Sequence, residues 1–176
     1  EMEKIITFLN SRQVDGLIIT PAEGSEVLIE SVLKGKKPLV LVDRGFPDLN
    51  VPSVLINNYE ICYRSTKQLI DQGFKNPAFI TYRQDQFHTN ERKRGFIEAM
   101  KDAGLFTPDH VKEVSYQYLN EDMDKAISQL LKCEKQVDAI FFATNTISMA
   151  GVKSLFKRGM LIQKDIQVMC FDETDA

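Results

Sequence analysis

Seven short runs of aliphatic and aromatic residues recur along the chain, and nearly all of them stop abruptly at a polar residue. Most runs are followed by a segment whose apolar residues have the spacing of a helix. Short apolar runs that alternate with helices are typical of parallel strands that are buried on both faces. The runs cover residues 14–19, 38–42, 54–56, 78–81, 111–116, 139–143 and 168–171. The pattern predicts an α/β fold in which parallel sheets are flanked by helices.

Polar residues stand at the positions where these strands would end. Thr20, Asp43, Asn57, Asn145 and Asp172 are the examples that carry hydrogen-bonding side chains. Parallel strands of a sheet end at one common edge, and ligands of open α/β sheets bind outside that edge. We therefore look for functional residues among these strand ends.

Segments with helical periodicity lie between the runs. They cover residues 1–9, 25–33, 59–70, 90–100, 124–131 and 147–156. Gly35, Gly73, Gly104 and Gly159 follow four of these segments, and glycine commonly ends a helix in the left-handed conformation. The pair 57–58 is two asparagines between a strand and a helix, which fits either a hinge between two lobes or an ordinary helix cap.

Composition excludes several classes of protein. The 176 residues carry a net charge of -3 and no basic block, so a strong electrostatic surface for nucleic acid or anionic membrane is not expected. No apolar run approaches the roughly 20 residues that span a bilayer. Cys62, Cys133 and Cys170 are odd in number and lack CxxC spacing, which favours a reduced, cytoplasmic compartment without disulfides. Both ends of the chain interrupt the strand–helix alternation, so we expect a fragment of a longer protein.

Motifs for catalysis or cofactor binding are absent from the sequence. There is no G-x-G-x-x-G after a strand, no P-loop and no G-x-S-x-G elbow. His88 and His110 are separated by a helix and lie in turn-like stretches, so we predict surface positions rather than a metal pair. Cys62 and Cys170 sit among apolar residues and are predicted to be core residues. We expect no enzyme activity, no metal and no cofactor.

Charged and aromatic residues near the strand ends are candidates for ligand binding. Asp43 and Asp172 can accept hydrogen bonds from a polar ligand, although helix capping is an alternative role for each. Arg83 and Arg92 present planar guanidinium groups, but residue chemistry alone favours a solvated helix charge at Arg92 because charged residues surround it. Aromatic residues that could stack on the apolar face of a ring are Phe46, Tyr82, Tyr116, Tyr118 and Phe171.

An ordered series of segments resembles the effector-binding core of LacI/GalR-type bacterial transcription regulators. The resemblance covers nearly the whole chain and keeps the order and approximate spacing of the family. The segments are Val14–Thr20, Pro38–Arg44, Val51–Val54 with Asn57-Asn58, Leu69–Phe74, Asn90–Phe96, Ala143–Asn145 and Cys170–Thr174. Periplasmic sugar-binding proteins have a similar core.

The resemblance implies a two-lobed, periplasmic-binding-protein-like (type I) fold that is truncated at both ends. Residues 1–57 would form part of the N-terminal lobe, and residues 58–176 would form most of the C-terminal lobe. A small polar effector, a sugar or a sugar derivative, would bind between the lobes. It would control operator DNA binding by an N-terminal helix-turn-helix that this chain does not include, in a homodimer without membrane contact.

The resemblance also implies which residues bind the effector. Arg92 matches the arginine that grips the effector three residues before a glycine, and Asp172 matches the aspartate of a strand-end motif. Asn145 ends the preceding strand, Tyr118 falls where an aromatic residue often flanks the pocket, and Asp43 matches a polar strand end of the other lobe.

Two positions depart from the family pattern, and three other functions remain open. Thr146 replaces a common aspartate, and Phe74 replaces a common histidine, so both changes bear on which effector is bound. The stripe of Met149, Val152 and Phe156 fits either a two-fold interface or packing on its own sheet. The alternatives are a solute-binding protein of a sugar transport system, an enzyme with a flavodoxin-like sheet, and a regulator whose partner is another protein.

Overall fold

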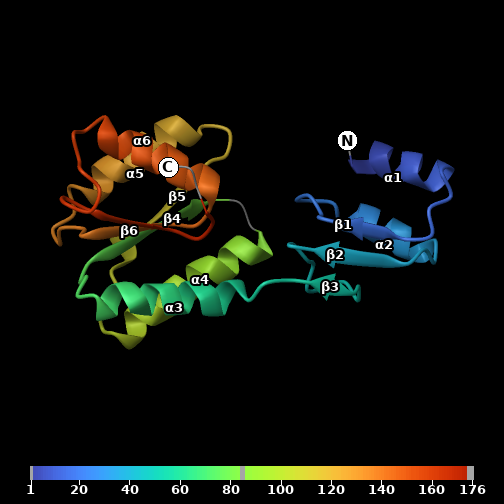
Figure 1. The fold of residues 1–176 in the computed structure, drawn as a ribbon, viewed down its shortest axis with the longest axis horizontal. Coiled ribbons are helices and arrows are strands. Elements are labelled where there is room, and N and C mark those ends of the chain that lie inside the picture. Colours follow the sequence, from blue (N-terminus) through green and yellow to red (C-terminus); the bar gives the residue numbers. More distant parts are fainter. Residues whose placement is uncertain (1, 84–85, 174–176) are drawn as a thin grey trace. The chain divides into compact units, whose positions relative to one another are not determined.

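The computed structural model describes residues 2–83 and 86–173 and divides into two compact units. Residues 1–57 with 86–88 form unit 1, and residues 58–85 with 89–176 form unit 2. All seven predicted strands are present and parallel, although the first begins at Leu17 rather than at Val14. Each unit places helices beside a parallel sheet (Figure 1). The predicted α/β class is therefore confirmed.

Unit 1 contains a sheet of three parallel strands in the order β1-β2-β3. Its elements are α1 (Met2–Ser11), β1 (Leu17–Ile19), α2 (Glu26–Lys34), β2 (Leu39–Val42) and β3 (Ser53–Val54). Leu17 and Leu41 of the sheet pack with Ile6 and Ile29 of the two helices in one buried cluster. Asp43 follows β2 directly, so its position is set by the end of that strand.

Unit 2 contains a sheet of four parallel strands in the order β5-β4-β6-β7. Its strands are β4 (Pro77–Tyr82), β5 (Val111–Val114), β6 (Ala139–Phe142) and β7 (Gln167–Cys170). Its helices are α3 (Asn58–Asp71), α4 (Phe87–Asp102), the 3-10 helix η1 (Pro108–His110), α5 (Leu119–Leu130) and α6 (Asn145–Phe156), although the first two residues of α4 group with unit 1. Every strand therefore ends at the same edge of this sheet.

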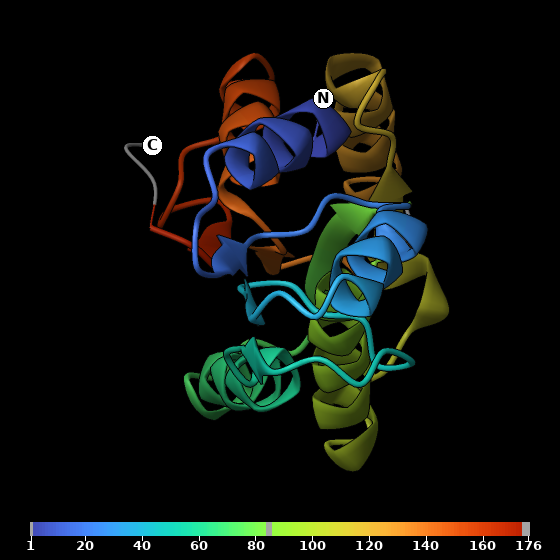
Figure 2. The same ribbon diagram turned by 90° about the vertical axis from the view of Figure 1, so that its right-hand side faces the viewer.

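Helices cover both faces of this sheet, which explains why the sequences of its strands are continuous apolar runs. Ile80 and Phe142 point to the face covered by α5 and α6, and they pack in one buried cluster. Phe79 and Phe141 point to the opposite face, where they pack with Phe96 of α4. The two views agree on this layering, and Figure 2 shows α3 beside α4. Alternate residues of one strand are therefore all buried, as a two-sided parallel sheet requires.

The prediction that Gly35 ends its helix in the left-handed conformation is wrong. Gly35 has a φ of -71° and the left-handed position is taken by Lys36 at 55°, whereas Gly73, Gly104 and Gly159 are left-handed as predicted.

The histidines are not surface residues either. His88 lies inside α4 and is 8% exposed, and His110 is 1% exposed with no partner for its two ring nitrogens in the described part of the chain. The turn-like sequence around each histidine indicates a surface position, so the local sequence alone does not predict this burial.

The helices of residues 2–83 and 86–173 include none with the length and apolar character needed to cross a bilayer.

Candidate functional site

The carboxyl edge of the unit 2 sheet gathers residues from four separate segments. Tyr82 ends β4, Asn145 follows β6, and Asp172 follows β7. Because β6 lies between β4 and β7, these three positions are neighbours along one edge. Arg92 reaches the same edge from the second turn of α4.

Arg92 is almost completely buried, which rules out the solvated helix charge that residue chemistry favoured. The residue is 5% exposed. Its Nε donates to Asn58 Oδ1 at 2.8 Å, and its Nη1 donates to the backbone oxygen of Ala143 at 2.7 Å. A buried guanidinium needs such acceptors, because an unpaired buried charge is strongly unfavourable. The side chain thus joins α3, α4 and the end of β6.

Asp172 and Asn145 lie beside this arginine. Arg92 Nη1 is 3.7 Å from Asp172 Oδ2, and the aspartate side chain is 43% exposed. Asn145 N donates to the same carboxylate oxygen at 3.2 Å, and Asn145 Nδ2 donates to Glu173 O at 3.0 Å. Asn145 begins α6, so the carboxylate is placed at the positive end of a helix. The structure therefore brings together three of the five predicted site residues.

Phe171 covers the arginine from another side. The carbon at the centre of the Arg92 guanidinium lies 3.6 Å from the centroid of the Phe171 ring. This contact is a cation–π interaction, which is stronger when water is excluded. Phe171 was a candidate for stacking on a ligand, and here its ring packs on Arg92 instead.

Tyr118 and Asp43 are the other two predicted site residues. Tyr118 is 56% exposed and lies in the segment between β5 and α5. In the sheet, β4 and β6 separate β5 from β7. Tyr118 therefore lies outside the cluster around Arg92. Asp43 belongs to unit 1, has a φ of 69°, and places its carboxylate 3.6 Å from Arg44 Nε.

A tyrosine–threonine group adjoins the cluster. The side chains of Thr144 and Thr146 lie near the Tyr82 hydroxyl and influence its pKa, and the Tyr82 ring lies 5.8 Å from that of Tyr116. Burial raises the pKa of Tyr82, while the two threonine side chains act in the opposite direction. Thr146, where the family commonly has aspartate, therefore interacts with a tyrosine of this chain.

Sequence reasoning missed the part that Asn58 plays. The sequence indicates a hinge or a helix cap at Asn58, and in the structure its side chain also accepts the Arg92 hydrogen bond across 34 positions of sequence. No spacing rule links the two residues, because the contact depends on how α3 and α4 pack. Arg83, the other candidate arginine, is 3.7 Å from Asp122 and largely exposed.

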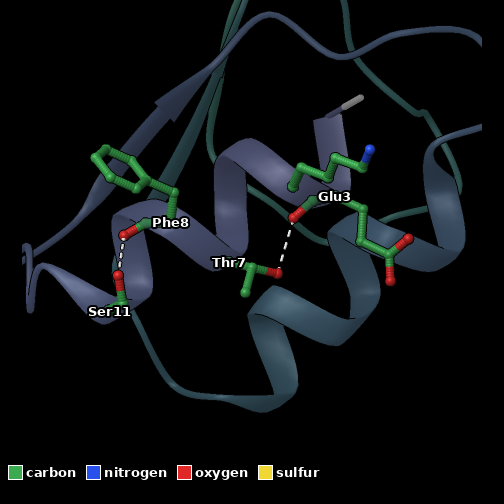
Figure 3. A pocket seen from close by; sticks show the side chains of 5 residues that line it. Glu3, Thr7, Phe8 and Ser11 are labelled. Carbon is green, nitrogen blue, oxygen red and sulfur yellow. Dashed lines mark hydrogen bonds between the residues drawn. The ribbon is translucent and has the colours of Figure 1, made fainter.

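A surface hollow along α1 in unit 1 lacks the features of a functional site. Figure 3 shows its lining by Glu3, Lys4, Thr7, Phe8 and Ser11, all from one helix. The Thr7 and Ser11 hydroxyls donate to backbone oxygens of their own helix at 2.9 and 2.7 Å. Within residues 2–83 and 86–173, moreover, no three His, Cys, Asp or Glu side chains gather as a metal site would require. The Arg92 cluster remains the best candidate.

Comparison with known proteins identifies the family of the chain. A family model described as periplasmic binding proteins and sugar binding domain of LacI family matches residues 1–176. The chain belongs to this family. Its parallel sheets and flanking helices are those of the periplasmic-binding-protein-like fold that the solved LacI-family regulators share.

Named relatives of this LacI-family chain are transcription regulators. Catabolite control protein A of Priestia megaterium is 27% identical over 177 residues, which are 98% of this chain and 53% of that protein. The HTH-type transcriptional repressor PurR of Actinobacillus pleuropneumoniae serotype 3 is 27% identical over 182 residues, covering 98% and 52%. The crystal structure of transcription regulator CcpA of Lactococcus lactis superposes with a TM-score of 0.80 at 27% identity, covering 96% of this chain and 61% of that chain. The chain thus spans about half the length of the curated relatives it matches.

Proposed function

We propose that the chain is the ligand-sensing part of a LacI/GalR-type transcription regulator. Its effector is a small polar molecule, a sugar or a sugar derivative, bound between two lobes to which units 1 and 2 belong. The observation that carries this proposal is the buried Arg92, which Asn58 and the Ala143 carbonyl hold beside the half-exposed Asp172. The family description, which names sugar-binding domains, supports the class of ligand.

The polar groups around Arg92 suit hydroxyl-rich ligands. Asp172 offers a charged acceptor, and Asn145 offers an amide at the surface of the same cluster. Hydrogen bonds from ligand hydroxyls to a carboxylate are stronger than those between neutral groups. The positive charge of the nearby guanidinium balances the negative charge of the carboxylate. The site therefore has no large net charge and suits neutral polyhydroxylated molecules. Asp43 and Tyr118 would complete the contacts from the other lobe and from the β5 side.

Ligand binding would act by favouring one orientation of the lobes. An effector shifts such an equilibrium only by its difference in affinity for the two states, commonly about 1–3 kcal/mol. In the whole protein, a dimer with an N-terminal helix-turn-helix would convert this shift into a change of operator affinity. Met149 and Phe156 of α6 are 45% and 57% exposed and belong to the face that we propose contributes to the dimer, whereas Val152 is buried.

A screen on the full-length protein tests this proposal. Sugars, sugar phosphates and purines are screened by thermal shift, and each hit is added to an operator-binding titration measured by fluorescence anisotropy. We expect a sugar-type hit that changes operator affinity by about 5-fold to 150-fold. A hit with no effect on DNA binding would contradict the regulator role. An upstream signal peptide in place of a helix-turn-helix would favour the transport-associated solute-binding protein.

A further inference from the structure

The helices α3 and α4 approach each other closely at Gly95. A Cβ atom at this position would lie 2.4 Å from Tyr59 O, 3.0 Å from Tyr63 N and 3.1 Å from Cys62 Cβ. Two of these atoms belong to the backbone of α3, so they cannot move without moving the helix. The backbone of α4 at Gly95 therefore packs directly on the backbone of α3.

Backbone conformation does not explain this glycine. Gly95 lies within α4 and has no positive φ, so any residue can adopt its conformation. Glycine in the interior of a helix is less favourable than alanine by about 1 kcal/mol. The explanation therefore lies in packing, at the place where the two helices meet.

The helix contact at Gly95 and the hydrogen bond of Arg92 lie on the same pair of helix faces. Arg92 and Gly95 are three positions apart, which places them on one side of α4. Asn58 and Cys62 are four positions apart on the facing side of α3. The bond from Arg92 Nε to Asn58 Oδ1 is 2.8 Å long and lies one turn from the tight contact at Gly95. The spacing of the helices at Gly95 thus sets the distance that this bond must span.

We propose that Gly95 is a positioning residue for the effector site, an inference that rests on the function proposed above. By leaving no side chain at the crossing, it holds Asn58 within hydrogen-bond distance of Arg92. The guanidinium is then oriented toward the Ala143 carbonyl and Asp172. Gly95 itself does not touch the effector.

A methyl group at Gly95 should break this arrangement. Moving Tyr59 O from 2.4 Å to an ordinary contact of 3.4 Å requires the helices to separate by 1.0 Å. A hydrogen bond of 2.8 Å would be lost by such a shift, because donor–acceptor pairs beyond about 3.5 Å no longer bond effectively. The expected result of Gly95→Ala is therefore a displaced Arg92 side chain in a unit that keeps its fold.

Gly151 provides a matched control in the same unit. A Cβ at this position of α6 would lie 2.2 Å from Cε1 and Cζ of Phe142. Gly151→Ala therefore creates a comparable collision, but against a side chain on the face covered by α5 and α6. It should lower the melting temperature without changing the Arg92–Asn58 contact.

Crystal structures of the full-length wild type and the two variants provide the test. We expect an Arg92 Nε to Asn58 Oδ1 distance above 3.5 Å in Gly95→Ala and 2.8 Å in Gly151→Ala. A retained bond in Gly95→Ala overturns the proposal. If Gly95→Ala does not fold, Cys62→Val provides the same test, because its extra methyl group is added on α3 at the contact with Gly95. A retained Arg92–Asn58 bond in Cys62→Val then overturns the proposal.

Isothermal titration with D-ribose and D-glucose separates this proposal from the proposed function. A sugar that binds the wild type should bind Gly95→Ala at least tenfold more weakly and Gly151→Ala unchanged. Equal affinity for Gly95→Ala and wild type, despite a lengthened bond, overturns the positioning role. A sugar affinity that Arg92→Ala leaves unchanged overturns the proposed effector site, while the measured bond still reports on Gly95.

Discussion

The central carbon of the Arg92 guanidinium lies over the ring of Phe171, at 3.6 Å from its centroid. Phe171 directly follows β7, and the next residue, Asp172, faces the same guanidinium. One short segment therefore supplies both an aromatic cover and a countercharge to an arginine that comes from α4. A cation–π contact of this kind contributes about 2 kcal/mol when it is shielded from water.

Replacing Arg92 should destabilise unit 2 as well as weaken effector binding. In Arg92→Ala, Asn58 Oδ1 and the Ala143 carbonyl lose a charged donor, and each hydrogen bond to a charged group contributes about 1.5–3 kcal/mol. Arg92→Lys keeps the charge but not the planar fork, so it should recover only part of the loss. Urea denaturation of the full-length protein measures both changes. Equal midpoints for wild type and Arg92→Ala would show that these bonds do not stabilise the fold.

Asp172→Asn should affect binding more than stability. The amide can still accept from Asn145 N, while the lost charge at the start of α6 costs about 0.3–1 kcal/mol. Loss of the half-exposed ion pair with Arg92 adds a cost of about 1 kcal/mol. Affinity for a sugar effector should fall by about tenfold or more, because hydrogen bonds to a charged acceptor are worth about 1.5–3 kcal/mol. Isothermal titration measures this loss. Asp138→Asn is the control: Asp138 accepts from Lys75 N and Asn76 N at the opposite edge of the sheet, so its replacement should spare binding.

Thr146→Val should raise the pKa of Tyr82 further. The pKa of Tyr82 is already above its ordinary value of 10.0 because of burial, and the Thr146 side chain opposes that shift. Because the folded state favours the neutral phenol, this contribution to stability is present below pH 10 and is lost as the pH rises through the folded-state pKa. Ultraviolet titration, with Tyr82→Phe to assign the signal, measures the change. A lower pKa of Tyr82 in Thr146→Val would contradict this influence of Thr146.

Cys62 should be the least reactive of the three thiols. Burial raises the pKa of Cys62 from 9.0 to about 12, although the Arg92 charge acts in the opposite direction. Its stabilising effect is therefore complete below pH 9 and lost as the pH rises toward 12. A thiol reagent at neutral pH should label Cys133 and Cys170, which are partly exposed, and should label Cys62 only after denaturant is added. Rapid native labelling at Cys62, detected by peptide mass spectrometry, would show that the α3–α4 packing opens readily.

Much of the fold was predictable because its signals are local. A strand buried on both faces needs consecutive apolar residues, as in 139–142, and each helix shows its apolar face by spacing alone. The candidate residues at strand ends were predictable for the same reason, since Asp172 and Asn145 come shortly after the ends of β7 and β6. The error at Gly35 arose because Lys36, one position later, takes the left-handed conformation.

The arrangement around Arg92 was not predictable from residue chemistry. Neighbours in sequence, such as Glu91 and Lys93, indicate a solvated helix surface, whereas the residue is 5% exposed. Only the resemblance to the family indicated a functional arginine, and it did not identify Asn58 or Phe171 as the groups that hold it. Roles for Asp43 and Tyr118 in binding stay predictions.

The sequence by itself determined the parallel strands, the helices between them, and the edge at which polar residues gather, because each depends on periodicity within a few residues. Only the tertiary structure decided which of those polar residues meet. Arg92 contacts Asn58, Ala143 and Asp172 across separations of 34, 51 and 80 positions, and helix packing, not local spacing, sets such distances. The physical reason is burial: the fold covers the guanidinium, and a covered charge must find acceptors wherever the packed elements provide them.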